Sequence, residues 1–175
     1  MIHTDYSIEA LALLLDRKCL SERYYALIPY KERLVSELTR LGCRMKSDAE
    51  KLSDDVLLSI GLGDADNVRL FRRFLTIYDP KPQKFREIEK LCLSPQEQAV
   101  FQELYHLPGV KNTRAELYSR AGFLSIRDIA EACEEEILAR TAAAIAENGL
   151  SCIVPLPKEV RTHIAVAKAF TREIG

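Results

Sequence analysis

The sequence carries almost no net charge and no long apolar run. Its 25 lysines and arginines nearly balance 26 aspartates and glutamates, which leaves a net charge of −1. Proteins committed to nucleic acid usually carry a basic surplus, so any such binding must depend on local patches. No apolar run approaches the roughly 20 residues that span a bilayer. The first residues, MIHTDYSIEA, contain no basic segment followed by an apolar one, so we expect no signal peptide. These absences predict a soluble cytoplasmic protein without a membrane partner.

The sequence also lacks paired cysteines. No two of the five cysteines form a CxxC pair; they are Cys19, Cys43, Cys92, Cys133 and Cys152. A metal site built from them is improbable, and isolated cysteines are typical of buried thiols in a reducing compartment. We therefore predict neither a metal site nor a cofactor.

Motifs of known catalytic chemistry are absent as well. There is no P-loop, no GxSxG elbow and no Rossmann glycine series, because GLGDAD lacks the third glycine. The three histidines, His3, His106 and His163, are scattered along the chain. The acidic run Glu134 to Glu136 fits a helix start, where it favours the helix dipole. We predict a non-enzymatic protein without catalytic residues.

The sequence does contain many signals that mark the starts of helices. Hydrophobic residues make up 47% of 175 positions, enough for a packed core. Capping boxes are predicted at SPQE (94–97), SDAE (47–50) and SIRD (125–128). Strand signals are poor, and the best candidate, 151–156, is limited by two prolines. The fold class predicted is all-α.

The sequence divides into two modules that resemble each other. DPKPQ (79–83) is the best boundary, which predicts modules at residues 1–78 and 84–175, the second ending in an amphipathic helix. Residues 38–58 align without a gap to residues 118–138, so that Gly42 meets Gly122 at an offset of about 80 positions. Each copy predicts a helix, a glycine turn, a short helix with an acidic cap, and another helix.

Two stretches resemble the helix-hairpin-helix motif, in which a short Gly-hydrophobic-Gly turn joins two helices. LLSIGLGDADNVRLFRRFL (57–75) contains the full turn in Gly61-Leu62-Gly63, and LPGVKNTRAELYSRAGF (107–123) contains part of it. The chain resembles a tandem helix-hairpin-helix protein of the SAM-like all-α class, with one motif in each module. This resemblance covers about 100 residues, and it implies sequence-independent DNA binding.

In the second hairpin the resemblance implies contacts with backbone phosphates. Gly109 matches the first glycine, and Val110 is the hydrophobic residue that points into the core. Lys111 replaces the second glycine, which either blocks close approach of the backbone or adds a charge contact. Thr113 and Arg114 supply further donors at the start of the next helix.

The first hairpin has both glycines of the motif, but its charges suit a phosphate less well than those of the second hairpin. Gly61 and Gly63 are both present, but two aspartates, Asp64 and Asp66, follow directly. An aspartate cap occupies the amides that a phosphate needs, so we expect Asp64 or Asp66 to cap the helix and the glycines to form only a corner. Arg69, Arg72 and Arg73 lie further along, and they either contact a DNA backbone or form a solvated face.

Two functions from different classes follow. The first is weak, sequence-independent binding of duplex DNA, mainly through the second hairpin. The alternative is a protein-interaction scaffold, which near-neutral charge suits. A contiguous basic patch around Lys111 and Arg114 would favour nucleic acid, while an exposed apolar groove would favour a protein partner. The sequence leaves the oligomeric state open.

Overall fold

This computed structural model describes residues 5–17, 20–79 and 82–171, and its regular elements there are all helices. The all-α prediction is confirmed, because these residues contain no strand and only an isolated antiparallel bridge between Ser7 and Met45. His3, Cys19 and residues 80–81 of the predicted linker lie outside them. No described helix combines the length and the apolar character needed to cross a membrane.

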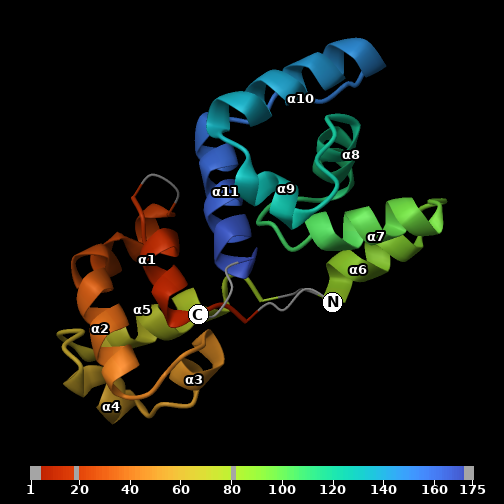
Figure 1. The fold of residues 1–175 in the computed structure, drawn as a ribbon. Helices are drawn as coiled ribbons and strands as arrows, with labels where there is room; N and C mark the ends of the chain where they lie inside the picture. The colour runs from red at the N-terminus through yellow and green to blue at the C-terminus, as the bar shows by residue number, and fades with distance from the viewer. Residues whose placement is uncertain (1–4, 18–19, 80–81, 172–175) are drawn as a thin grey trace.

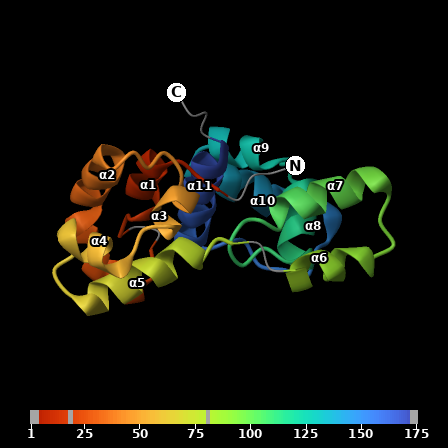
Figure 2. The same cartoon turned by 90° about the horizontal axis from the view of Figure 1, so that it is seen from below.

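The elements follow one another in two groups. The first group is η1 (Ile8–Ala10), α1 (Leu11–Leu14), η2 (Glu22–Tyr30), α2 (Lys31–Arg40), α3 (Lys46–Glu50), α4 (Asp54–Ser59) and α5 (Ala65–Thr76). The second group is α6 (Pro82–Glu89), α7 (Pro95–Leu104), α8 (Asn112–Arg120), α9 (Ile126–Glu131), α10 (Glu134–Asn148) and α11 (Pro157–Thr171). Figure 2 shows α1–α5 on one side of the molecule and α6–α8 on the other.

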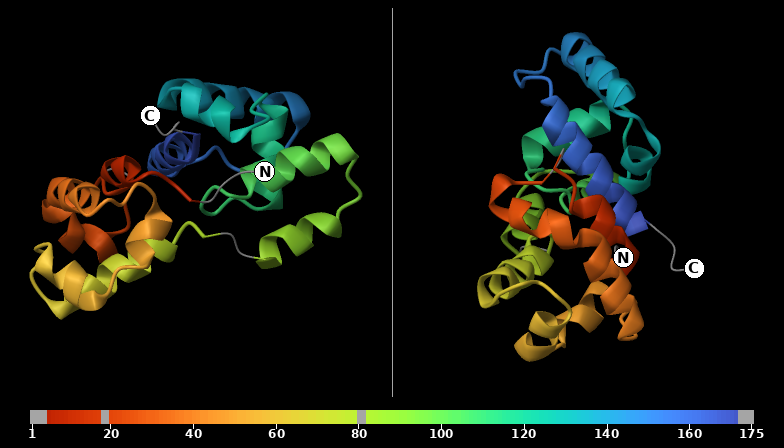
Figure 3. Two further views of the ribbon diagram at one scale, coloured as in Figure 1. Left: turned by 60° about the horizontal axis from the view of Figure 1, so that its bottom comes forward. Right: turned by 90° about the vertical axis from the view of Figure 1, so that its left-hand side faces the viewer.

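Helix α11 joins the two groups into one core. It runs between them (Figure 1) and packs against α9 and α10 of its own group and against α1 of the other. Near its end, the ring of Phe170 lies 6.0 Å from that of Tyr6 and 6.4 Å from that of Tyr78, both in the first group. The last helix therefore returns to the first module, as the two views in Figure 3 also show.

The two aligned segments, 38–58 and 118–138, share hydrogen bonds at equivalent positions, 80 residues apart. After the end of α2, the amide of Cys43 donates to the Leu38 carbonyl at 2.9 Å. After the end of α8, the amide of Phe123 donates to the Tyr118 carbonyl at 2.9 Å. The carboxylate of Asp48 then accepts from the Arg44 amide at 2.9 Å, and that of Asp128 accepts from the Leu124 amide at 2.8 Å. Both segments therefore turn from one helix into the next with equivalent hydrogen bonds.

The two glycine corners, however, are not equivalent in the two halves. At the offset of 80, Gly109 corresponds to Pro29, which lies inside η2 where that helix runs directly into α2. Proline holds φ near −65° and cannot adopt the +74° of Gly109. The corner at Gly61–Gly63, in turn, has no counterpart, because α10 continues unbroken from Glu134 to Asn148. The two glycine corners therefore occupy different positions in the two aligned halves.

Of the three predicted capping boxes, the one at Ser94 is complete, whereas Ser125 caps α9 without the return bond, because the Asp128 carboxylate accepts from the Leu124 amide. The Ser94 hydroxyl accepts from the Glu97 amide at 3.2 Å at the start of α7, and the Ser125 hydroxyl accepts from the Asp128 amide at 3.1 Å at the start of α9. The third prediction was wrong, because α3 begins at Lys46 and Ser47 lies inside it. The Ser47 hydroxyl bonds instead to Asp5, which the bridge beside Ser7 brings close.

Candidate nucleic-acid interface

The corner between α7 and α8 is a glycine turn with an exposed backbone and a buried side chain directly after it. Gly109 is exposed and has a φ of +74°, a value that side chains rarely tolerate, and a Cβ atom added to it would meet nothing within 4 Å. Val110 is fully buried, as predicted, and its amide donates to the Leu107 carbonyl at 3.2 Å. Backbone at Gly109 therefore faces open space while the next side chain anchors the corner in the core.

A buried histidine fastens this corner to α11. The Nε2 atom of His163 lies 2.8 Å from the Pro108 carbonyl oxygen, and its Nδ1 atom lies 2.6 Å from the Tyr118 hydroxyl. Because a carbonyl only accepts, Nε2 carries the proton and Nδ1 accepts from the hydroxyl. Burial raises the pKa of the Tyr118 phenol well above its usual value, so the hydroxyl stays a donor at neutral pH.

Helix α8 begins without a side-chain cap. Lys111 occupies the capping position in an extended conformation, and no side chain accepts from the first-turn amides there. Side chains do cap several other described helices: Ser53 on α4, Asp64 on α5, Ser94 on α7, Ser125 on α9 and Cys133 on α10. Lys111 and Thr113 are both exposed. The start of α8 thus offers unpaired amides, the positive end of the helix dipole and an adjacent lysine.

Arg114 does not extend into solvent. Its guanidinium donates to Glu159 at 2.7 and 3.2 Å and to the Ile153 carbonyl at 2.7 Å. Burial acts to raise the pKa of Glu159, but the hydrogen bond and charge of Arg114 outweigh it and hold that pKa below its usual value. The arginine predicted to reach a phosphate is therefore engaged in holding α8 to the start of α11.

In the first hairpin, Gly61 and Gly63 both have a φ of +92°, and Leu62 between them is buried. The prediction of an aspartate cap is confirmed, since the Asp64 carboxylate accepts from the Asn67 amide at 2.9 Å at the start of α5. The side chain of Arg33 also covers Gly61, because a Cβ atom added there would lie 2.5 Å from the Arg33 Cζ atom. The Arg33 side chain therefore covers the backbone at Gly61, whereas the backbone at Gly109 is open to solvent.

The arginines of α5 are largely committed to neighbouring groups. Arg69 pairs with Asp66 on the same helix. Arg72 pairs with Asp54 and also donates to the Leu52 carbonyl, which ties α5 to α4. Arg73 is exposed. These three residues and the glycines therefore do not combine into one basic surface.

An apolar loop that was not predicted from the sequence lies beside the second hairpin. Between α10 and α11, the side chains of Ile153 and Leu156 are 73% and 65% exposed, and Val154 is also exposed. The Ile153 carbonyl accepts from Arg114, so this loop lies next to the first turn of α8. The apolar residues of SCIVPL (151–156) indicated this loop in the sequence, but the stretch was interpreted as a weak strand candidate.

Comparison with protein-family models, with curated proteins and with solved structures gives no match for this chain.

Proposed function

We propose that the chain binds the backbone of duplex DNA, without reading its sequence, through the α7–α8 corner. The uncapped start of α8 is the observation that carries this proposal, because phosphate oxygens are acceptors that suit free amides at a helix N-terminus. Gly109 supports it by giving a phosphate open access to the backbone, and Val110 by anchoring the corner in the core.

Each exposed residue of the corner has a distinct part in this proposal. Lys111 supplies the long-range positive charge, and Thr113, the second residue of α8, adds a hydroxyl donor. Arg114 acts indirectly: by bonding to Glu159 it fixes the direction in which the amides of α8 point. Contacts of this kind position a protein on a duplex without sequence preference.

The first hairpin is left out of the proposed site. The Asp64 carboxylate already accepts from an α5 amide and repels a phosphate. Arg69 and Arg72 are paired with Asp66 and Asp54. A single short corner with one lysine, in a chain of net charge −1, predicts weak binding with a shallow salt dependence, because only one phosphate is neutralised by a side chain.

A titration of fluorescent duplex DNA at two salt concentrations tests the proposal. We expect Lys111→Gln to weaken binding and to reduce the slope of log K against log salt by about 0.9, the value for one lost phosphate contact. Lys51→Gln, which removes an exposed lysine from the first module, serves as the matched control and should bind as the parent does. Equal affinity and slope for the parent and Lys111→Gln would contradict the proposal.

A second candidate, a protein-interaction scaffold, is favoured by the exposed side chains of Ile153, Val154 and Leu156. Three neighbouring apolar side chains on one loop are typical of protein contact surfaces. The two candidates differ in their response to salt, because salt weakens phosphate contacts and does not weaken apolar association. Absence of DNA binding at low salt would leave the scaffold as the better interpretation.

A further inference from the structure

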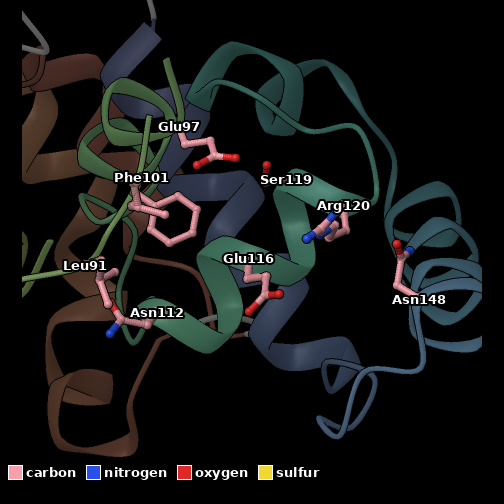
Figure 4. Close-up of a pocket in the computed structure, with 9 residues that line it drawn as sticks. Leu91, Glu97, Phe101, Asn112, Glu116, Ser119, Arg120 and Asn148 are labelled. Atoms are coloured by element: carbon pink, nitrogen blue, oxygen red, sulfur yellow. The ribbon is translucent and has the colours of Figure 1, made fainter. Parts of the chain in front are cut away.

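A cavity of about 540 Å³ opens between the loop that precedes α7, helices α7 and α8, and the end of α10. This volume lies in the range of roughly 300–1,000 Å³ that is typical of small-molecule sites. Leu91, Leu93 and Phe101 give the cavity an apolar part, and Glu116, Arg120 and Asn148 give it a polar part. Figure 4 shows Leu91 and Phe101 on one side of the cavity, Arg120 and Asn148 toward the other, and Glu116 between them.

The polar part holds two opposite charges that are not paired. Glu116 and Arg120 lie one turn apart on α8, a spacing at which such side chains commonly pair. Within the described residues, however, no ion pair joins them to each other or to another side chain. Elsewhere in the same group, Arg114 pairs with Glu159 and Arg140 with Glu136. The cavity therefore presents one carboxylate and one guanidinium that both lack a partner.

Asn112, at the other end of α8, has a side-chain acceptor that receives no hydrogen bond. Its Oδ1 atom is buried and has no hydrogen-bond partner, although the residue is only half-buried and lines the cavity. A buried acceptor without a donor is costly. A ligand that carries N–H groups relieves this cost when the amide turns toward it.

We infer that this cavity binds a small zwitterion with an apolar side chain, of the class of the hydrophobic and aromatic α-amino acids. The ammonium group bonds to Glu116, and the carboxylate bonds to Arg120, which is suited to planar two-pronged contacts. The side chain lies against Phe101, Leu91 and Leu93. Glu97 also lines the cavity, so the lining carries two carboxylates and one guanidinium, and the ammonium group is the essential feature. The inference does not depend on DNA binding.

Isothermal titration of the full chain with L-phenylalanine tests the inference, with two analogues that each remove one charge. Phenylalaninamide lacks the carboxylate, and N-acetylphenylalanine lacks the ammonium group. We expect saturable binding of L-phenylalanine, and affinities about tenfold or more lower for both analogues, since each loses one charge-assisted contact. Equal binding of the three compounds, or no saturable binding of L-phenylalanine, would overturn the inference.

Two variants assign the charges to residues. Glu116→Gln and Arg120→Gln should each lower the affinity for L-phenylalanine about tenfold or more. Both side chains are exposed on α8, so thermal unfolding should match the parent. Glu135→Gln and Arg23→Gln, exposed and outside the cavity, are the matched controls and should bind normally. Binding that survives both cavity variants, or that the controls weaken as much, would also overturn the assignment.

Discussion

Arg114 and Glu159, 45 positions apart in the sequence, form an ion pair of 2.7 Å between the first turn of α8 and the first turn of α11. Only 14% of the Arg114 side chain and 29% of the Glu159 side chain are exposed. The same guanidinium holds the Ile153 carbonyl, so one arginine fixes the hairpin, the apolar loop and α11 together. Its position makes it a residue of the scaffold beneath the proposed DNA site.

Replacing Arg114 should therefore reduce stability more than it changes the salt dependence of DNA binding. We expect Arg114→Gln to lower the free energy of unfolding by about 2 kcal/mol, because Glu159 and the Ile153 carbonyl both lose a charge-assisted donor. Urea denaturation measures this loss. The salt slope of DNA binding should stay at the parental value, in contrast to Lys111→Gln. A reduced slope with unchanged stability would instead identify Arg114 as a direct phosphate contact.

The same pair predicts an acid-dependent loss of stability. Because the pKa of Glu159 is lower in the folded chain than in the unfolded one, its contribution is present above the unfolded value of about 4.3 and is lost as the pH falls through the folded value. The free energy of unfolding of Glu159→Gln should thus fall less steeply than the parent's between about pH 5 and pH 3. Parallel pH profiles for the two proteins would show that the pair contributes nothing.

Much of the local structure is predictable because it depends on neighbours in the sequence. Ser94 and Glu97 lie three positions apart and cap α7 as their spacing requires. Asp64 caps α5 for the same reason. Val110, the apolar residue of the α7–α8 turn, is buried as its hydrophobic side chain predicts. The two caps depend on bonds within a single turn, which sequence motifs describe well.

The contacts that define the candidate site depend instead on tertiary packing. The pairs Arg114–Glu159 and Pro108–His163 join residues 45 and 55 positions apart, and no periodicity in the sequence indicates that α11 crosses the hairpin. The cavity charges Glu116 and Arg120 have the spacing of an ordinary solvated helix pair. Only the placement of α7 and α10 makes them line a cavity.

The glycine corners offer a matched pair of substitutions. Gly109→Ala and Gly61→Ala both place a side chain at positive φ, and each should destabilise the chain by about 1–2 kcal/mol. The clash of a new methyl group with Arg33 adds little, because that side chain is exposed and can move. Under conditions where both variants are folded, Gly109→Ala should weaken DNA binding and Gly61→Ala should not. Equal effects on DNA would argue against the α7–α8 corner as the site.

His163 should be a major determinant of hairpin stability. His163→Phe leaves the Tyr118 hydroxyl and the Pro108 carbonyl without their partners, and we expect a loss of about 2–4 kcal/mol in the free energy of unfolding. Tyr118→Phe removes one of these bonds and should cost less. The double variant should lose less than the sum of the single losses, because the two residues share a bond. Strictly additive losses in urea denaturation would contradict a direct coupling.

Lys46 predicts a loss of stability at alkaline pH. Its side chain is 6% exposed, pairs with Asp79 and Glu50, and lies 5.9 Å from the centre of the Tyr6 ring. Burial acts to lower the pKa of Lys46, but the hydrogen bonds and charges of Asp79 and Glu50 outweigh it and raise that pKa. The stabilisation is therefore complete below the unfolded value of about 10.4 and is lost as the pH rises through the folded value.

Lys46→Met, which keeps the apolar stem and removes the charge, isolates this contribution. At pH 8 we expect a loss of about 1–2 kcal/mol in the free energy of unfolding, moderate because Asp79 and Glu50 are 40% and 38% exposed and regain water. The gap between the variant and the parent should narrow between pH 8 and pH 11. Lys51→Met, at the exposed end of α3, is the control for loss of a surface lysine. A gap that stays constant with pH would mean that packing of the stem, and not the charge, supplies the stability.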